Sequence, residues 1–375
     1  MANTLKLGAG KWATGTDTVL AFNDENNNFK PLPFSFSRAS SATVVNQSGL
    51  IETVGSGTPR IDFKDDAKGA LLLEPSRTNL WTESEGTSII LNSPLGEFGF
   101  YTLKNSQISR TISASDPISF TFIVKKIDGT IPTITSSSGN GDLVIYVGGG
   151  SSAGLSGVLT NIGDGFYKFK LTGYSNSGTG IEIIQNKSGV DTYVSLIQFE
   201  VGSYATSYIP TSGSAVTRIA ETCNNGANSQ VINSTEGVLY AEISAIADDS
   251  TLKSVCISDS TTTNRVIINY SNQSNRLTAD VRVGAVGQAF MQTFNFTITN
   301  FLKIAVKYKA NDFALWVNGT EAATDNSGIT FSANTLNNLS LDNGAGGEDF
   351  YGKIKDIRIY NQALTDAELQ ALTTI

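Results

Sequence analysis

Short apolar runs with a two-residue period recur along almost the whole sequence, and this pattern constrains the fold most strongly. In residues 302–308 and 354–360, apolar and polar side chains alternate. Such alternation places the apolar side chains on one face of a β-strand. Gly, Asn and Ser separate the runs, as in antiparallel sheets with one face toward solvent. The sequence therefore predicts an all-β protein, and its other strand-like runs are 119–124, 166–171, 193–199, 238–243, 265–270 and 313–317.

The composition and two local signals agree with this prediction. Of the 375 residues, 36 are Gly and only 16% are charged. Abundant Gly, Ser, Thr and Asn suit turns and half-exposed strands better than helices. Asn318-Gly319 predicts a two-residue hairpin turn. One helix is expected over 364–372, where Thr365 and Glu368 have the spacing of a capping box.

The distribution of these elements predicts three segments. We expect an extended N-terminal anchoring segment over 1–75, followed by two antiparallel jelly-roll sandwiches in tandem. The sandwiches are assigned to 76–212 and 213–375, with a polar Ser- and Thr-rich linker at their boundary. Strands at short intervals without intervening helices favour such sandwiches over parallel βαβ units.

Charge and residue content exclude several classes of function. Lys and Arg total 26 against 34 Asp and Glu, a formal net charge of −8, which argues against nucleic-acid partners. No run reaches the ~18 apolar residues of a membrane helix, and the N-terminus lacks the apolar core of a secretion signal. The chain has no His, the usual general base and commonest zinc ligand. Cys223 and Cys256 are expected to be free thiols, with a disulfide as the alternative.

Three stretches carry a family resemblance: FSRASSATVV at 36–45, LLLEPSRTNL at 71–80 and QFEVGSYATSYIPT at 198–211. Together they resemble a module of tailed-bacteriophage virion proteins, which occurs in tails, fibres and other surface appendages beside a carbohydrate-binding-module-like jelly roll. The resemblance covers about residues 30–218. It implies a virion protein, assembled in the host cytoplasm, whose partners are other virion proteins and a host-surface polysaccharide or glycan. It also implies a homo-oligomer, trimeric in a fibre.

A second resemblance covers residues 215–375. The strings DFALWVNG at 312–319 and FYGKIKDIRIYNQALTDAEL at 350–369 resemble the end of a laminin-G-like, concanavalin A-like jelly roll. That family includes sugar binders, glucanases, adhesion modules and passive spacers. The resemblance thus indicates a fold more specifically than a function.

The candidate ligand-binding residues lie in this second sandwich. Trp316 offers a ring for stacking on a sugar, with Asp342 and Asn343 as polar contacts; the alternative for Trp316 is a core position. Asp342, Glu348 and Asp349 offer hard oxygen ligands in a Gly-rich loop. Calcium is therefore the one cofactor considered, and a solvated acidic turn is the alternative.

Arg38, Arg60, Arg77 and Arg218 stand out because charged residues are scarce. We expect them to have structural roles, since guanidinium groups satisfy buried carbonyls and carboxylates in turns. Arg77 is expected to pair with Glu74 or Asp62.

The sequence predicts no enzymatic activity. Glucanases of this fold commonly carry Glu-x-Asp-x-x-Glu on one strand, where alternation places the carboxylates on one face. Here Glu348 and Asp349 are adjacent, and Glu236 and Glu242 are too widely spaced. We therefore predict a structural protein of a phage tail or other virion appendage that mediates adhesion to host glycans. The alternatives are a purely structural virion protein, a polysaccharide depolymerase and a bacterial adhesin; the adhesin is disfavoured because we see no secretion signal or anchor.

Overall fold

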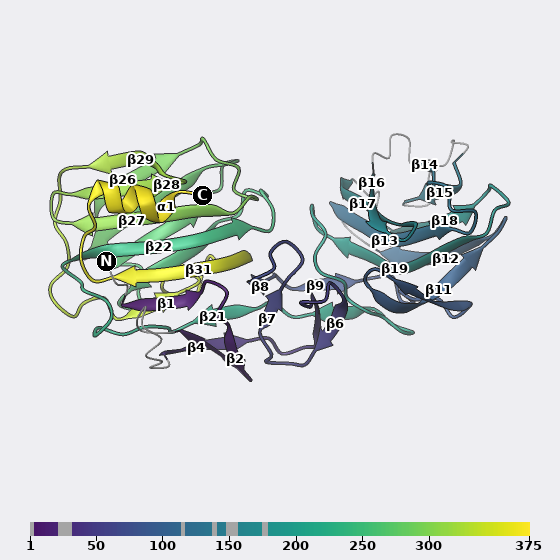
Figure 1. Cartoon of the computed structure of the whole chain (residues 1–375), viewed down its shortest axis with the longest axis horizontal. Helices are drawn as coiled ribbons and strands as arrows, with labels where there is room; N and C mark the ends of the chain where they lie inside the picture. Colours follow the sequence, from purple (N-terminus) through teal and green to yellow (C-terminus); the bar gives the residue numbers. More distant parts are fainter. Residues whose placement is uncertain (1–3, 22–31, 114–116, 137–140, 148–156, 175–178) are drawn as a thin grey trace. The chain divides into compact units, whose positions relative to one another are not determined.

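The chain forms two compact units, as a computed structural model shows (Figure 1). The structure describes residues 4–21, 32–113, 117–136, 141–147, 157–174 and 179–375. Unit 1 comprises Met1–Ala39, Gly55–Pro75 and Ala220–Ile375, and unit 2 comprises Ser40–Val54 and Ser76–Ile219. The described residues form thirty-one strands and one short helix, which confirms the all-β prediction.

The N-terminal residues 1–75 do not form the separate anchoring segment that the sequence predicted. In unit 1, β1 (Leu5–Gly8) and β8 (Ala70–Leu73) both pair with β31 (Gly352–Tyr360), near the other end of the chain. A hairpin within this segment, β5 (Ala42–Val45) and β6 (Ile51–Val54), belongs instead to unit 2. The prediction was wrong because composition indicates strands and turns but does not identify partners some 300 residues away.

Unit 1 is a sandwich whose two main sheets enclose one core. The strands of the larger sheet run in the order β29 (Thr320–Asp325), β28 (Phe313–Val317), β27 (Leu302–Lys309), β22 (Glu236–Ala245), β31, β8 and β7 (Arg60–Asp62), with β1 also on β31. The five-stranded sheet runs β26 (Val286–Thr293), β25 (Leu277–Val283), β24 (Arg265–Tyr270), β23 (Lys253–Ser258) and β30 (Asn338–Ser340). A further sheet contains β2 (Ala13–Gly15), β3 (Thr18–Ala21), β4 (Leu32–Ser37) and β21 (Thr222–Asn224).

Alternation along the strands of unit 1 explains which side chains form its core. On β27, Leu302, Ile304 and Val306 point into the core between the sheets. Helix α1 (Asp366–Thr373) contacts β27, β28 and β29 and covers the opposite face of the larger sheet (Figure 1). Both faces of this sheet are therefore apolar where the helix lies. The predicted capping box is confirmed, because the Thr365 and Glu368 side chains each accept a hydrogen bond from the other's backbone N–H.

Unit 2 is a second β-sandwich. Its six-stranded sheet runs β10 (Ile89–Ser93), β11 (Gly96–Leu103), β19 (Thr192–Val201), β13 (Ile118–Lys126), β17 (Phe166–Tyr174) and β16 (Val158–Gly163). The four-stranded sheet runs β12 (Gln107–Ser113), β18 (Thr179–Asn186), β15 (Leu143–Tyr146) and β14 (Ile134–Ser136). A two-stranded pair joins β9 (Arg77–Asn79) to β20 (Val216–Arg218). Aromatic side chains dominate its core, where Phe120 packs between Trp81 and Phe199.

Two further local predictions are confirmed. Asn318 and Gly319, both with positive φ, join β28 to β29 in a two-residue hairpin. Cys223 and Cys256 are free and buried, and burial raises the pKa of both thiols. No helix in the described ranges is long and apolar enough to span a bilayer.

Candidate functional site

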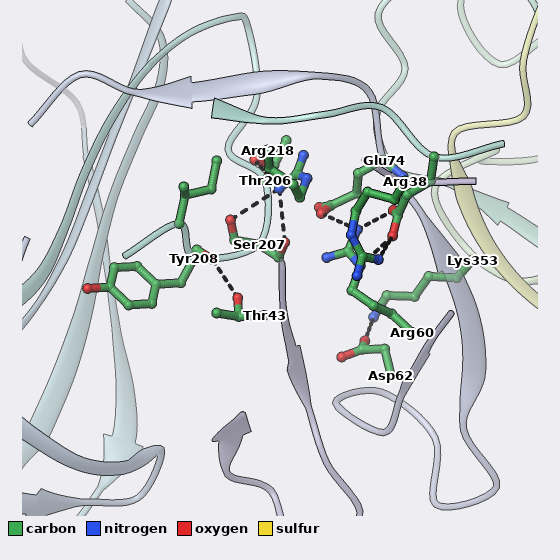
Figure 2. Close-up of polar contacts among 12 residues, drawn as sticks. Arg38, Thr43, Arg60, Asp62, Glu74, Thr206, Ser207, Tyr208, Arg218 and Lys353 are labelled. Carbon is green, nitrogen blue, oxygen red and sulfur yellow. Dashed lines mark hydrogen bonds and ion pairs between the residues drawn. The ribbon is translucent and has the colours of Figure 1, made fainter. Parts of the chain in front are cut away.

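Arg38 and Arg60, two of the four arginines singled out in the sequence, form a charge cluster with Glu74 and Glu221 in unit 1. Arg60 binds Glu74 at 2.9 Å through Nη2 and Glu221 at 2.8 Å through Nε, and Arg38 binds Glu221 at 2.7 Å (Figure 2). These side chains are at most 2% exposed. Burial opposes the charge on Arg60, but the two carboxylates raise its pKa overall. Because no ligand can reach the cluster, its role is structural, as expected.

The ion pair predicted for Arg77 is wrong. Glu74 pairs with Arg60, and Asp62 pairs with Lys353 at 2.5 Å (Figure 2). Arg77, on β9 of unit 2, instead lies over the ring of Tyr204, 4.9 Å from its centroid. The pairing was misassigned because the partner of each carboxylate depends on the folded arrangement of the strands: β7 carries Arg60, and β31, distant in sequence, carries Lys353.

Arg218 also serves a structural purpose, within unit 2. It is buried, and its Nη1 donates to Thr206 Oγ1 at 3.2 Å and to Ser207 Oγ at 3.0 Å (Figure 2). In the same unit, Thr43 Oγ1 donates to the backbone oxygen of Tyr208 at 2.5 Å. These contacts tie the first and last resemblance stretches together, so the motif residues of unit 2 hold its fold.

Trp316 is not available as a sugar-stacking ring. It is 7% exposed and lies in the apolar cluster beneath α1, with Tyr240, Tyr360 and Leu369. Its position follows from β28, whose second face is covered by the helix. A sugar could reach this ring only if the helix were displaced, so the core alternative describes Trp316 in this structure.

The predicted polar residues of the 342–349 loop lie over the edge of the five-stranded sheet. The backbone oxygen of Asn343 accepts a hydrogen bond from Arg265 Nη1 at 3.2 Å, and Glu348 Oε2 accepts from Ser254 Oγ at 3.1 Å. Gly344 has φ +92°, and a Cβ there would lie 2.8 Å from Ser258 Oγ. Only glycine permits this approach, so the loop forms a wall against β23.

The three carboxylates predicted to bind calcium do not converge. Glu348 turns toward Ser254, while Asp342 Oδ1 accepts from the backbone N–H of Gly344 at 2.6 Å. Burial raises the pKa of Asp342, and the neighbouring Asp349 raises it further. Across the described ranges, no three Asp, Glu or Cys side chains gather closely enough to hold a metal ion. Asp342, Glu348 and Asp349 therefore do not form a cluster of carboxylates around one point.

Beside this loop, the five-stranded sheet presents side chains that point away from the core. Residues directly opposite each other on antiparallel strands share one face, and the register therefore defines the set. We call it the polar face. It comprises Ser254, Cys256, Ser258, Arg265, Ile267, Asn269, Arg276, Thr278, Asp280, Arg282, Phe290, Gln292, Phe294, Asn338 and Ser340, with Arg276 and Phe294 just beyond the ends of β25 and β26.

The polar face changes from buried to exposed across the sheet. Its side chains on β23 and β30 are buried, where the loop wall lies. Toward β26 the face opens, and Phe290 and Phe294 are 56% and 50% exposed. The Arg276 guanidinium lies 5.9 and 5.7 Å from the centroids of these two rings. Two exposed aromatic rings thus lie close to one guanidinium on this face of the sheet.

Hydrogen bonds fix the orientation of two amides on the polar face. Gln292 Oε1 accepts from Arg276 at 2.7 Å, and Asn269 Oδ1 accepts from Ser254 Oγ. Among the described residues, neither amide nitrogen has a protein acceptor, so both NH₂ groups remain for a ligand. The face thus combines flat apolar rings with oriented donors, the combination that binds sugar rings and their hydroxyls.

The carboxylate of the polar face is committed to ion pairs. Asp280 Oδ2 binds Arg282 Nε at 2.6 Å and lies 3.5 Å from Arg265 Nη2. The two glutamates considered from the sequence lie on β22 of the other sheet, where Glu236 pairs with Lys309 and Glu242 lies near Lys355. Glycoside hydrolysis requires an acid and a second carboxylate on either side of the bond. The described part of the polar face contains no such pair.

The sequence analysis missed the exposed residues of the polar face, although a signal was present. Residues 278–282 read Thr-Ala-Asp-Val-Arg, an alternation that places three polar side chains on one face of β25. Their partners on β24 and β26 could not be predicted, because the local residue pattern does not determine which strands pair with each other. Phe290 and Phe294 could not be singled out among the 19 Phe, because their exposure depends on the same strand pairing.

Comparison with known proteins bears on the fold of unit 1. Residues 241–370, about a third of the chain, match a laminin G family described as the concanavalin A-like lectin/glucanases superfamily. The matched range contains every strand of the five-stranded sheet. Unit 1 therefore contains a concanavalin A-like β-sandwich. A search of the curated proteins gives no match.

Similar solved structures are distant. A sialidase carbohydrate-binding module (CBM40) from Ruminococcus gnavus is 17% identical, with a TM-score of 0.34, and the alignment covers 40% of this chain and 93% of that one. A domain of an arabinanase from Geobacillus stearothermophilus, bound to arabinotriose, is 13% identical, with a TM-score of 0.32 and coverage of 46% and 84%. A pentraxin from Limulus polyphemus is 11% identical, with a TM-score of 0.29 and coverage of 37% and 70%. Similarity at this level supports no inference about a ligand.

Proposed function

We propose that the chain is a glycan-binding protein of a bacteriophage tail or other virion appendage, and that the polar face is its receptor-binding surface. The observation that carries the proposal is the open side of this face. There, Phe290 and Phe294 expose their rings beside an oriented amide of Gln292. Sugar rings stack on aromatic faces, while their hydroxyls accept hydrogen bonds from such amides.

Two independent features support the assignment. The family match covers lectins as well as glucanases, and its range, residues 241–370, includes every residue of the polar face. The virion location rests on the resemblance of residues 36–45, 71–80 and 198–211 to phage appendage proteins. A homo-oligomer would present several polar faces at once, and multivalency can raise avidity by about 10²–10⁴-fold.

We further propose that the chain binds glycan without cleaving it. Asp280, the carboxylate on the polar face, is held by Arg265 and Arg282. A carboxylate in two ion pairs is poorly placed to donate a proton to a glycosidic oxygen. Incubation of the protein with host polysaccharide, followed by a reducing-end assay, should therefore yield no new ends; their release would favour a depolymerase.

Binding of the labelled full chain to host cells tests the receptor-binding role. The wild-type protein, presented on beads, should bind saturably, and purified host polysaccharide should compete. Phe290→Ala and Phe294→Ala should each weaken the binding about tenfold, because each removes one stacking surface. Val286→Ala is the matched control, since Val286 is also an exposed apolar residue of β26 but pairs with Val283, on the other face.

Each outcome distinguishes between the candidate functions. Loss of binding in the Phe variants alone, with unchanged circular dichroism, supports the polar face as the receptor site. Equal binding by all variants would place the receptor site elsewhere. No binding by the wild type would leave a purely structural virion protein, which mass spectrometry of purified particles would still detect. Its absence from the particles would overturn the virion assignment.

A further inference from the structure

Unit 1 has a further pocket, which we call the end pocket, and none of its lining residues belongs to the polar face. It lies among the loop before β22, the loop between β29 and β30 and the residue after β31. Its volume is about 220 Å³. The lining residues are Ser229, Gln230, Ile232, Asn233, Ser234, Ala333, Asn334 and Asn361.

The walls of this end pocket are held in place by hydrogen bonds. Asn233 Nδ2 donates to the backbone oxygen of Asn361 at 2.9 Å, which joins two of the three segments. The buried Ser234 Oγ accepts from the backbone N–H of Leu336 at 2.9 Å, which joins the third. Below them, the Tyr308 hydroxyl donates to the backbone oxygen of Asn233 at 2.7 Å. The pocket is therefore preorganised rather than formed by loose loops.

Four side chains around the end pocket are uncommitted. The side chains of Ser229, Gln230, Asn334 and Asn361 make no hydrogen bond or ion pair with another described residue. Three of them are amides, and each amide offers two donors and an acceptor. This density of donors and acceptors suits a ligand that carries several hydroxyl groups.

The lining also limits the class of ligand. It contains no Asp, Glu, Lys or Arg and no aromatic ring, so neither a formal charge nor ring stacking is favoured. Sites for drug-sized ligands measure about 300–1,000 Å³. A pocket of about 220 Å³ is smaller and suits one sugar ring.

We infer that the end pocket is a second saccharide site, which binds one neutral sugar unit through hydrogen bonds alone. It differs from the polar face in its chemistry, because the polar face offers aromatic rings and guanidinium groups. Its lining also shares no residue with the polar face, so substitutions can alter one site at a time. A chain with both sites could hold two units of one glycan, or two glycans, in each copy.

Saturation-transfer NMR on the full chain with glucose, galactose, mannose and N-acetylglucosamine tests this inference. At least one of these sugars should bind, with a Kd of about 1–10 mM, as weak single-site contacts do. Asn334→Gly is the sharpest variant: Asn334 has φ +62°, which glycine adopts freely, so the amide is removed without backbone strain. Together with Gln230→Ala, it should weaken the binding at least about fivefold.

The controls separate the two sites. Val286→Ala, outside both sites, should bind the neutral sugar as the wild type does. The double variant Gln230→Ala/Asn334→Gly should still adhere to host cells, so failure of one proposal does not imply failure of the other. The inference is overturned if none of the four sugars binds at about 50 mM. It is also overturned if binding persists undiminished in the double variant, or if Phe290→Ala alone removes it.

Discussion

At the scale of single residues, one buried charge cluster of unit 1 joins segments that are distant in sequence. Glu221 accepts hydrogen bonds from Arg38, from Arg60 and from the backbone N–H of Glu74. All these groups are buried, so each charge depends on its partners for compensation. That the arginines are structural could be predicted from their rarity, but their partners could not, because Glu221 lies 161 residues from Arg60.

Glu221→Gln should destabilise the protein by about 3–5 kcal/mol, because it leaves buried guanidinium charge uncompensated. Urea unfolding followed by fluorescence would measure this loss. Glu236→Gln is the control, since Glu236 forms only a surface pair with Lys309 at 3.4 Å, and removing such a pair should cost less than about 1 kcal/mol. Similar losses in both variants would contradict the compensating role of Glu221.

Asp342→Asn should stabilise the protein at neutral pH. Burial and Asp349 raise the pKa of Asp342, so its ionisation opposes folding. A carboxyl group whose pKa is higher in the folded state than in the unfolded state stabilises the fold at low pH. This stabilisation is complete below the pKa of the unfolded chain, about 3.9. It is lost as the pH rises through the pKa of the folded state. The thermal midpoint of the variant should thus exceed that of the wild type at pH 7, and the gap should narrow toward pH 4. A variant that is less stable at pH 7, with or without added Ca²⁺, would contradict this interpretation of the loop.

At the scale of elements, strands could be predicted well and their faces only in part. The alternation in 302–308 and 354–360 identified β27 and β31 because each has a face toward the core. The same alternation could not reveal that α1 covers the second face of β28, and Trp316 was therefore considered as a ligand contact. The polar face was missed for a related reason: it combines residues from five strands, and only their register brings them together.

Thr365→Ala should cost about 1 kcal/mol, because it removes one half of the capping box of α1. The helix covers Trp316, so unfolding followed by tryptophan fluorescence would report the change. Gln370→Ala, at an exposed position of the same helix, should have little effect or a slightly stabilising one. If the two variants were equally stable, the capping box would not stabilise the helix.

At the scale of the whole molecule, the chain passes repeatedly between its two units. Residues of unit 1 come from three stretches, and those of unit 2 from two. Two tandem sandwiches could be predicted from strand spacing and from the resemblances. The interleaving of the two units could not be predicted, because no local pattern indicates that β1 and β8 pair with β31 near the other end of the chain.

A fragment of residues 213–375, the domain drawn from the sequence, should therefore fail to fold stably. It lacks β1 and β8, whose Leu5, Leu7 and Leu71 are fully buried in the core of unit 1. Burial of each such side chain contributes about 1.5–3 kcal/mol, and β31 would expose an unpaired edge. Circular dichroism and thermal unfolding of the fragment, beside the full chain, provide the test. A soluble fragment with a cooperative transition near that of the full chain would contradict the interleaved arrangement.

Calorimetric titration of the full chain with purified host oligosaccharide would show whether the polar face binds glycan. We predict saturable binding to the full-length protein, about tenfold weaker in Phe290→Ala and unchanged in Val286→Ala. Both variants should unfold at the wild-type temperature, because both side chains are more than half exposed. Equal affinity of the wild type and Phe290→Ala for the oligosaccharide would contradict glycan binding by the polar face.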